Sequence, residues 1–188
     1  MKNTHNKNLH GFWSGPFSQW AQSDFKLCGF SFNTAEQAMM LGKAALFHDV
    51  HHAQLIMDSI SPNDQKGYGR KVKGFDQPKW EDICIELVTA ISYAKFTQDA
   101  KYFTAMEATG NDWIVEASPY DKVWGIGMKV DHPDFKDPSK WQGTNYLGEC
   151  VMNAREIIFN PNLQNIKNLA VAVNTVEKIY DNVRGQIT

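Results

Sequence analysis

The chain has 188 residues and a formal net charge of -2 at pH 7, with 43% hydrophobic and 21% charged residues. This length favours one domain, and the composition is ordinary for a globular protein. The slight acidity argues against a generally basic nucleic-acid binder but leaves room for a local basic patch. No apolar run approaches the length of a membrane span, and the three isolated cysteines predict no disulfide framework, which fits a reducing cytoplasm.

The N-terminal residues, 1–10, are polar and lack the apolar core of a secretory signal. We expect them to be disordered or frayed, ahead of a single domain over residues 11–188. The following stretch, 11–33, is rich in aromatic residues and glycine, which suits short strands and turns. A helix is expected to begin at Thr34, because Thr34 and Gln37 have the spacing of a capping box.

Similar local signals predict the later elements. Ser61 and Pro62 fit the cap and first position of a second helix, and a third helix should start near Asp76. The buried stripe expected on this third helix is Trp80, Cys84, Leu87, Ile91 and Ala94. A shorter helix should end near Gly110, before a strand over residues 113–118 and an irregular stretch over residues 119–144.

Two further helices, roughly residues 145–158 and 161–183, are expected to close the chain. The apolar face predicted for the last one comprises Leu163, Ile166, Leu169 (or Ala170), Val173 and Ile179. The expected fold class is therefore mainly α with a few short β-strands, an α+β arrangement in one compact domain.

The first candidate site pairs Glu36 with Lys43 on the helix that begins at Thr34. Seven residues are almost two helical turns, so both side chains lie on one face, and the lysine stem can reach back toward the acid. Met40 makes this face apolar, and partial desolvation there should shift both proton affinities. The alternative is a solvated surface ion pair, which the spacing alone favours.

The second candidate is a pair of cations, Lys66 and Arg70, which are neighbours on one helix face. Two adjacent cations suit a phosphate or diphosphate, and Gly67 and Gly69 would let a ligand approach the backbone closely. The alternative is that the glycines fray the helix and the cations are solvated.

The third candidate lies in residues 116–127, which contain Asp121, Trp124 and Gly125. A loop after a strand is a suitable place to hold a carboxylate and an indole over a flat ligand. Trp141 and Asn145 offer another aromatic group and an amide nearby in sequence. The alternative is that both tryptophans anchor their loops against the core.

Other common sites find little support. His48 and His52 have the spacing of helical zinc ligands, but the intervening Glu of the HExxH pattern is missing, and a solvated helix end is the preferred interpretation. No P-loop, GxGxxG fingerprint, nucleophile elbow or Cys–His pair is present in the sequence. We expect neither a metal ion nor another cofactor.

Taken together, these motifs resemble the NADAR (YbiA-like) family over residues 12–155. The resemblance is carried by residues 30–36, Lys43, residues 66–70, Trp80, Lys95 with Phe96, residues 116–127, residues 141–148 and Met152. Two features depart from the family pattern. Met40 stands where relatives often carry Gln, and residues 16–20 differ from the usual Ser-Asn-Phe. Either difference can alter the substrate without removing the chemistry.

The resemblance implies a mainly helical YbiA-like domain and an N-glycosidase activity on a phosphorylated ribose or ADP-ribose derivative. Some members act on riboflavin-pathway intermediates, and others remove ADP-ribose from guanine bases. The implied partner is a nucleotide-like small molecule, free or attached to nucleic acid, with no membrane and no obligate protein partner.

Roles for the site residues follow from the chemistry that the resemblance implies. Glu36 and Asp121 are the candidate carboxylates, in an order that the sequence leaves open. Lys43 either donates a hydrogen bond or attacks a ring-opened ribose as a Schiff base. The expected substrate-binding residues are Lys66, Gly67, Arg70, Trp80, Trp124, Gly125, Trp141 and Asn145. The alternative function is a module that binds ADP-ribose or an NAD derivative without hydrolysing it.

Overall fold

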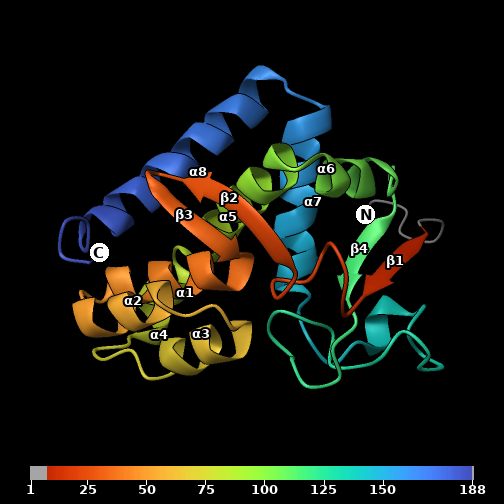
Figure 1. Ribbon diagram of the computed structural model, residues 1–188. Coiled ribbons are helices and arrows are strands. Elements are labelled where there is room, and N and C mark those ends of the chain that lie inside the picture. The colour runs from red at the N-terminus through yellow and green to blue at the C-terminus, as the bar shows by residue number, and fades with distance from the viewer. Residues whose placement is uncertain (1–7, 188) are drawn as a thin grey trace.

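Eight α-helices and four short strands make up residues 8–187, the part of the chain that the computed structural model describes (Figure 1). The helices are α1 (Ala35–Leu46), α2 (Val50–Met57), α3 (Pro62–Gly69), α4 (Gln77–Glu81), α5 (Cys84–Gln98), α6 (Ala100–Glu107), α7 (Tyr146–Phe159) and α8 (Leu163–Asp181). A short 3-10 helix, η1 (Pro138–Lys140), interrupts the long stretch before α7. The predicted class, mainly α with a few short strands in one domain, is confirmed.

The strands form two separate pairs. β1 (Leu9–Phe12) runs parallel to β4 (Trp113–Glu116), with Phe12 opposite Glu116. β2 (Gln22–Leu27) and β3 (Phe30–Thr34) form an antiparallel hairpin. The expectation of a frayed start over residues 1–10 is wrong at Leu9 and His10, which pair with β4; residues 1–7 lie outside the described residues.

Helix α1 lies at the centre of the fold and packs against α2, α3, α5 and α8. Its predicted cap is present, because the Thr34 hydroxyl accepts the Gln37 backbone N–H at 3.0 Å. The Gln37 side chain completes the turn one residue earlier than expected, accepting the Asn33 N–H at 2.9 Å. Both bonds fix the start of α1, and therefore the direction in which its first turn presents Glu36.

Two helix predictions need correction. The third predicted helix is broken at Asp82 and Ile83 into α4 and α5, although Trp80 and Cys84 are both buried. Helix α2 was not expected. The chain breaks at His48, which has a φ of 55°, and the Asp49 side chain then caps α2.

This break also limits the interpretation of the histidines as a solvated helix end, which holds for the exposed His48 but is wrong for His52. Asp49 and His52 are buried, and the Nδ1 atom of His52 lies 2.7 Å from the Asp49 carboxylate. His48 precedes the cap of α2, so it does not share a helix face with His52.

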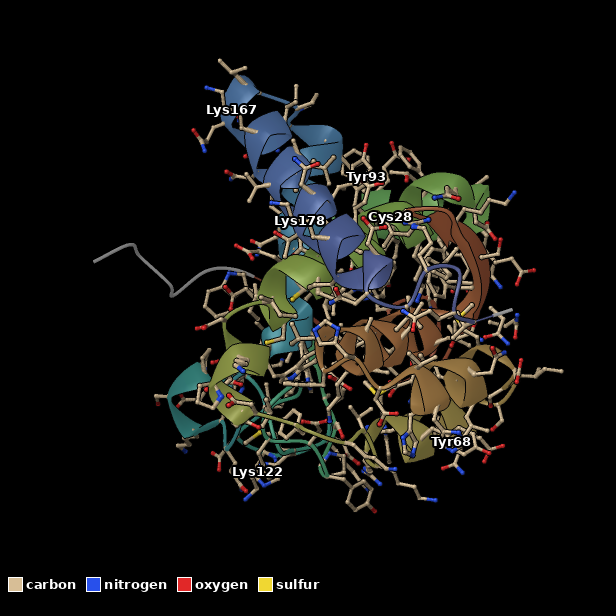
Figure 2. All side chains as sticks on the ribbon, turned by 90° about the vertical axis from the view of Figure 1, so that its left-hand side faces the viewer. Cys28, Tyr68, Tyr93, Lys122, Lys167 and Lys178 are labelled. Atoms are coloured by element: carbon tan, nitrogen blue, oxygen red, sulfur yellow. The ribbon has the colours of Figure 1, made fainter. Side chains whose placement is uncertain are left out.

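The predicted apolar face of the last helix is buried only in part. Ile179 and its neighbour Tyr180 are buried near the end of α8, whereas Leu163 and Ile166 near its start are 69% and 52% exposed. Figure 2 shows that the end of α8 that carries Lys167 stands clear of the main body. No helix of the described residues is long and apolar enough to cross a membrane.

The stretch between β4 and α7 builds a small core of its own. Val115 and Ala117 pack with Ile126, Met128 and Phe135, apart from the main core around α1 and α5. Ile114, the alternate residue of β4, faces the main core. β4 therefore packs against a core on each side. The loop that follows it is held in place by its own residues in the small core.

Candidate active site

A cavity of about 690 Å³ opens between the loop after β1, helices α1 and α3, and the loop after β4. Its volume is in the range of pockets that bind small ligands. The residues that line it are Trp13, Ser14, Gly15, Ser18, Gln19, Trp20, Ala21, Glu36, Met39, Met40, Lys43, Asn63, Lys66, Gly69, Arg70, Trp80, Glu116, Ser118, Tyr120, Asp121, Trp124 and Leu147. Three regions that are far apart in sequence, and that were singled out separately, therefore share one site.

Glu36 enters the cavity from the first turn of α1 and is only 4% exposed. Its Oε2 atom accepts the indole N–H of Trp20 at 3.2 Å. Burial raises the pKa of Glu36 to about 7, and this effect outweighs Lys66 and the Trp20 hydrogen bond, which lower it. A carboxyl group with this pKa is populated in both its protonated and ionised forms near neutral pH.

Glu116, at the end of β4, is a second acid; it lies in the candidate segment of residues 116–127, but the sequence indicated no role for it. Burial raises its pKa to about 7 as well, and the charges of Asp121 and Glu36 add to the effect. Its Oε2 atom is buried and has no hydrogen-bond partner among the described residues. Glu116 is therefore a carboxyl group with a free oxygen at the edge of the cavity.

Asp121 is held in the loop after β4 by its neighbours. Its Oδ1 atom accepts the backbone N–H groups of Val123 and Trp124 at 2.9 and 2.7 Å. These bonds fix the carboxylate and leave its second oxygen, Oδ2, without any of the described hydrogen bonds. Because its charge raises the pKa of both Glu36 and Glu116, Asp121 is electrostatically part of the same acidic group.

Lys43 lines the cavity two turns along α1 from Glu36, as predicted, but no ion pair joins the two among the described residues. Its ammonium lies instead 4.1 Å from the centre of the Phe75 ring. Burial and the nearby charge of Arg70 lower the pKa of Lys43, while Glu36 opposes the shift. The expected partly desolvated amine is therefore present.

Lys66 and Arg70 bring positive charge from α3 to the same cavity. Both lower the pKa of Glu36, so they are close enough to act on it. The Lys66 ammonium lies 5.8 Å from the centre of the Trp20 ring. Unlike the acids, Arg70 is exposed, which is compatible with holding a charged group that enters from solvent.

Of the two glycines that were expected to admit a ligand, Gly69 lines the cavity. A Cβ atom on Gly69 would lie 2.0 Å from the sulfur of Met40, so this glycine allows α3 to pack closely on α1. Gly67 does not line the cavity, and a Cβ atom there would meet nothing within 4 Å.

Three other predicted binding residues are not among the described residues that line the cavity: Gly125, Trp141 and Asn145. A Cβ atom on Gly125 would lie 2.9 Å from the Glu116 carbonyl oxygen, so its role is to allow tight loop packing. Asn145 accepts the Glu116 N–H and donates to the Ile114 carbonyl, at 2.9 and 3.0 Å. It therefore positions Glu116 from behind the cavity wall.

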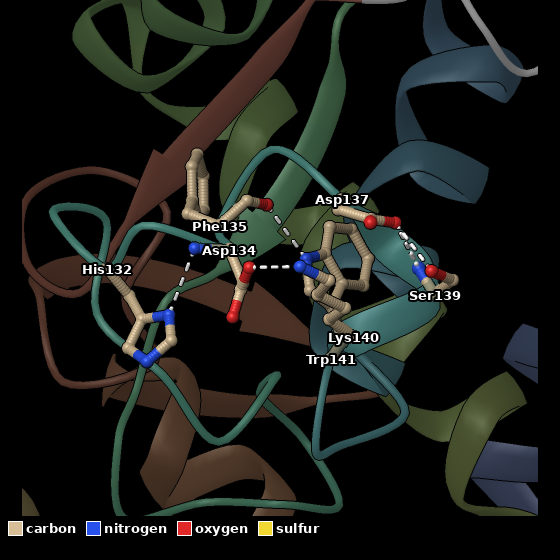
Figure 3. A network of polar contacts seen from close by, with 7 residues as sticks. All are labelled: His132, Asp134, Phe135, Asp137, Ser139, Lys140 and Trp141. Carbon is tan, nitrogen blue, oxygen red and sulfur yellow. Dashed lines mark hydrogen bonds and ion pairs between the residues drawn. The ribbon is translucent and has the colours of Figure 1, made fainter.

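Trp141 anchors its loop, which was the alternative interpretation. Its indole N–H donates to the Phe135 carbonyl at 2.9 Å, beside the ion pair of Asp134 with Lys140 (Figure 3). Its ring also packs against Trp113, with the centroids 6.2 Å apart. The aromatic residues that do reach the cavity are Trp13, Trp20, Trp80, Tyr120 and Trp124.

The loop after β1 is the largest omission of the sequence reasoning. It supplies Trp13, Gln19 and Trp20, and the Gln19 Nε2 atom is buried without a hydrogen-bond partner among the described residues. Its aromatic residues were visible in the sequence, but nothing local indicated which of them face a ligand. The buried Gln19 Nε2 and Glu116 Oε2 atoms are suited to hydrogen bonds with a polar ligand, because native folds leave few such atoms unsatisfied.

The cavity thus combines acids, a partly desolvated amine, exposed positive charge and aromatic rings. This arrangement suits proton transfer and charge stabilisation on a polar, anionic ligand that carries a flat group. Among the described residues, no group of three or more His, Cys, Asp or Glu side chains has the geometry to hold a metal ion.

Comparisons with known proteins agree with the resemblance noted in the sequence. The family model of the NADAR domain matches residues 6–159. N-glycosidase R617 of Acanthamoeba polyphaga mimivirus is 39% identical over 145 residues, which cover 74% of this chain and 85% of that protein. N-glycosidase Npun_R5314 of Nostoc punctiforme is 24% identical over 146 residues, which cover 78% and 86%.

The fold is shared with a solved structure as well. The NMR structure of the E. coli protein YbiA matches with a TM-score of 0.66 and 24% identity, over 84% of this chain and 89% of YbiA. The matched family region contains every residue that lines the cavity. The chain therefore belongs to the NADAR family.

Proposed function

We propose that this N-glycosidase cleaves the bond between a phosphorylated ribose, such as ADP-ribose or a ribose phosphate, and a nitrogen base. One observation carries the proposal: the buried Glu36 and the partly buried Glu116, each with a pKa of about 7, line one cavity with the cations Lys66 and Arg70. The names of the relatives R617 and Npun_R5314 support the reaction class.

The reaction needs acid and base chemistry at two places. The C1′–N bond breaks and its electron pair passes to the base nitrogen, which takes up a proton; water then gives its hydroxyl to C1′ and releases a proton. Positive charge develops on the ribose, and a nearby carboxylate stabilises it. We assign charge stabilisation and activation of water to Glu36 and Asp121, and protonation of the leaving base to Glu116.

The phosphate groups are assigned to Lys66 and Arg70. Cationic side chains bind phosphate through charge-assisted hydrogen bonds, and the guanidinium of Arg70 offers a fixed fork of donors. Trp80 and Trp124 line the same cavity and supply flat surfaces on which a base can stack.

Lys43 has two roles that are compatible with its lowered pKa. As an ammonium it donates a hydrogen bond to the sugar or to the leaving group. As a neutral amine it attacks C1′ of the ring-opened ribose: the C1′–N bond to the base breaks, the base leaves with a proton, and water later hydrolyses the resulting Schiff base. Trapping with borohydride separates the roles, because only a Schiff base leaves a stable covalent adduct on the protein.

The test is chromatography of the products after incubation with ADP-ribosylated guanosine and, separately, with phosphorylated riboflavin-pathway intermediates. We expect free base to be released from at least one of them. Tight binding of ADP-ribose by calorimetry without base release would instead support the alternative, a non-catalytic ADP-ribose or NAD-derivative module. If the protein neither binds ADP-ribose nor releases a base, both functions are refuted.

A further inference from the structure

Lys95 is a buried cation that the proposed chemistry does not use. It lies on α5 with only 2% of its surface exposed, and no ion pair of the described residues involves it. Burial lowers the pKa of Lys95 to about 7. An amine buried without an acid is unfavourable for the fold, so its presence calls for a reason other than packing.

The only hydrogen bond described for the Lys95 ammonium connects it to the loop after β1. Its Nζ atom donates to the Ser18 carbonyl oxygen at 2.8 Å. That oxygen also accepts the Ala21 N–H at 3.2 Å and thereby closes a turn over residues 18–21. The adjacent Phe96 ring packs on Phe17, with the centroids 5.4 Å apart. Lys95 and Phe96, which both belong to the family resemblance, therefore contact two consecutive residues of this loop, Ser18 and Phe17.

The same turn carries both contacts between this loop and Glu36. The Gln19 carbonyl accepts the Glu36 backbone N–H at 3.0 Å, and the Trp20 indole N–H donates to the Glu36 carboxyl at 3.2 Å. Ser18 is thus bound to Lys95, Gln19 to the Glu36 backbone, and Trp20 to the Glu36 side chain. A shift of the Ser18 carbonyl would move the Trp20 indole away from the acid.

We propose that Lys95 is a positioning residue of the N-glycosidase reaction, holding the turn over residues 18–21 so that the Trp20 indole N–H stays on the Glu36 carboxyl. It does not line the cavity and touches no substrate; it acts through Trp20 and Glu36. The inference rests on the proposed function, in which Glu36 takes part in the chemistry.

The test compares Lys95→Met with Lys101→Met, a lysine that is exposed on α6 and lies 6.0 Å from the centre of the Tyr102 ring, which Lys95 also approaches. For Lys95→Met we expect kcat to fall by about 10- to 100-fold, with KM changed less than about threefold, because misplaced groups slow the chemical step. The melting temperature should stay close to that of the wild type, because methionine loses the hydrogen bond to Ser18 but also removes the cost of burying an amine. Lys101→Met should match the wild type in all three measurements.

A spectroscopic measurement without substrate distinguishes positioning from general support of the fold. The NMR signal of the Trp20 indole N–H, assigned with Trp20→Phe, should shift as Glu36 titrates in the wild type and lose this shift in Lys95→Met. If Lys95→Met does not fold, Lys95→Gln, which keeps one short donor, takes its place. The inference would be overturned if the Trp20 signal of Lys95→Met still shifted with pH as in the wild type, or if the kcat of Lys95→Met equalled that of the wild type. Absence of base release by the wild-type protein would refute the proposed function alone, because the NMR comparison still judges Lys95.

Discussion

Replacing Glu36 by Gln is expected to abolish turnover and, at high pH, to stabilise the fold. The side chain is 4% exposed, and burial raises its pKa from 4.5 to about 7, so the folded state binds this proton more tightly than the unfolded state. Below pH 4.5 both states are protonated, and the group leaves stability unchanged. As the pH rises from there through 7, stability is lost, and at about 1.4 kcal/mol per pH unit the ionised acid destabilises the fold by roughly 3 kcal/mol.

The glutamine variant has no such proton, so its stability should depend less on pH. Between about pH 5.5 and about pH 8.5, the wild type should lose roughly 2 kcal/mol of unfolding free energy that Glu36→Gln keeps. Urea denaturation followed by tryptophan fluorescence measures this difference. The matched control is Glu107→Gln on α6, which changes an exposed carboxylate in the same way.

Two results would refute this reasoning about Glu36. A stability difference between the variant and the wild type that is the same at both pH values would mean that burial does not perturb the acid. Base release at the wild-type rate by a folded Glu36→Gln would remove the acid from the mechanism. The amide oxygen of the variant can still accept the Trp20 N–H, so loss of activity would not reflect loss of that bond.

Two other predictions concern the remaining charges of the cavity. Glu116→Gln should lower kcat by about 100-fold or more, the usual effect of losing a general acid, while calorimetry shows ADP-ribose bound as in the wild type; normal turnover would exclude Glu116 as the proton donor. Lys66→Ala and Arg70→Ala should each weaken ADP-ribose binding by about tenfold or more, as expected for a lost charge-assisted hydrogen bond, and lower kcat far less. Lys122→Ala, on the exposed part of the loop beside Asp121, serves as their control, and equal weakening in all three variants would indicate only a diffuse charge effect.

The fold was predictable where the signal is local. Thr34 and Gln37 predict the start of α1, because a capping box depends only on residues that are close together in the sequence. The breaks at His48 and before Cys84 were missed because neither contains Gly or Pro, the residues that usually stop a helix. The first break is followed by a local signal, the Asp49 cap of α2, whereas the second is not, because Ile83 has no side chain that can cap α5.

The same distinction applies to the site. Glu36 and Lys43 were recognised because helical periodicity places them on one face. Glu116 lay in the candidate segment of residues 116–127 but received no role. Its place at the cavity depends on the parallel pairing of β4 with β1, whose residues are about a hundred positions away. Asn145 was assigned to the ligand because it is close in sequence to Trp141. The sequence does not show that its amide points away from the cavity and bonds to the backbone of β4.

The charges of the cavity favour an enzyme over a binding module. Among the described residues, no ion pair joins Glu36, Glu116 or Asp121 to Lys43, Lys66 or Arg70, although all six line one cavity. A protein that only binds ADP-ribose would gain from the cations and lose from the acids, since carboxylates repel phosphate. A protein that cleaves the glycosidic bond needs both, because the phosphates are negative throughout while the ribose becomes positive only in the transition state. The acids are therefore explained by a charge that appears during the reaction, and this is the physical reason for expecting turnover.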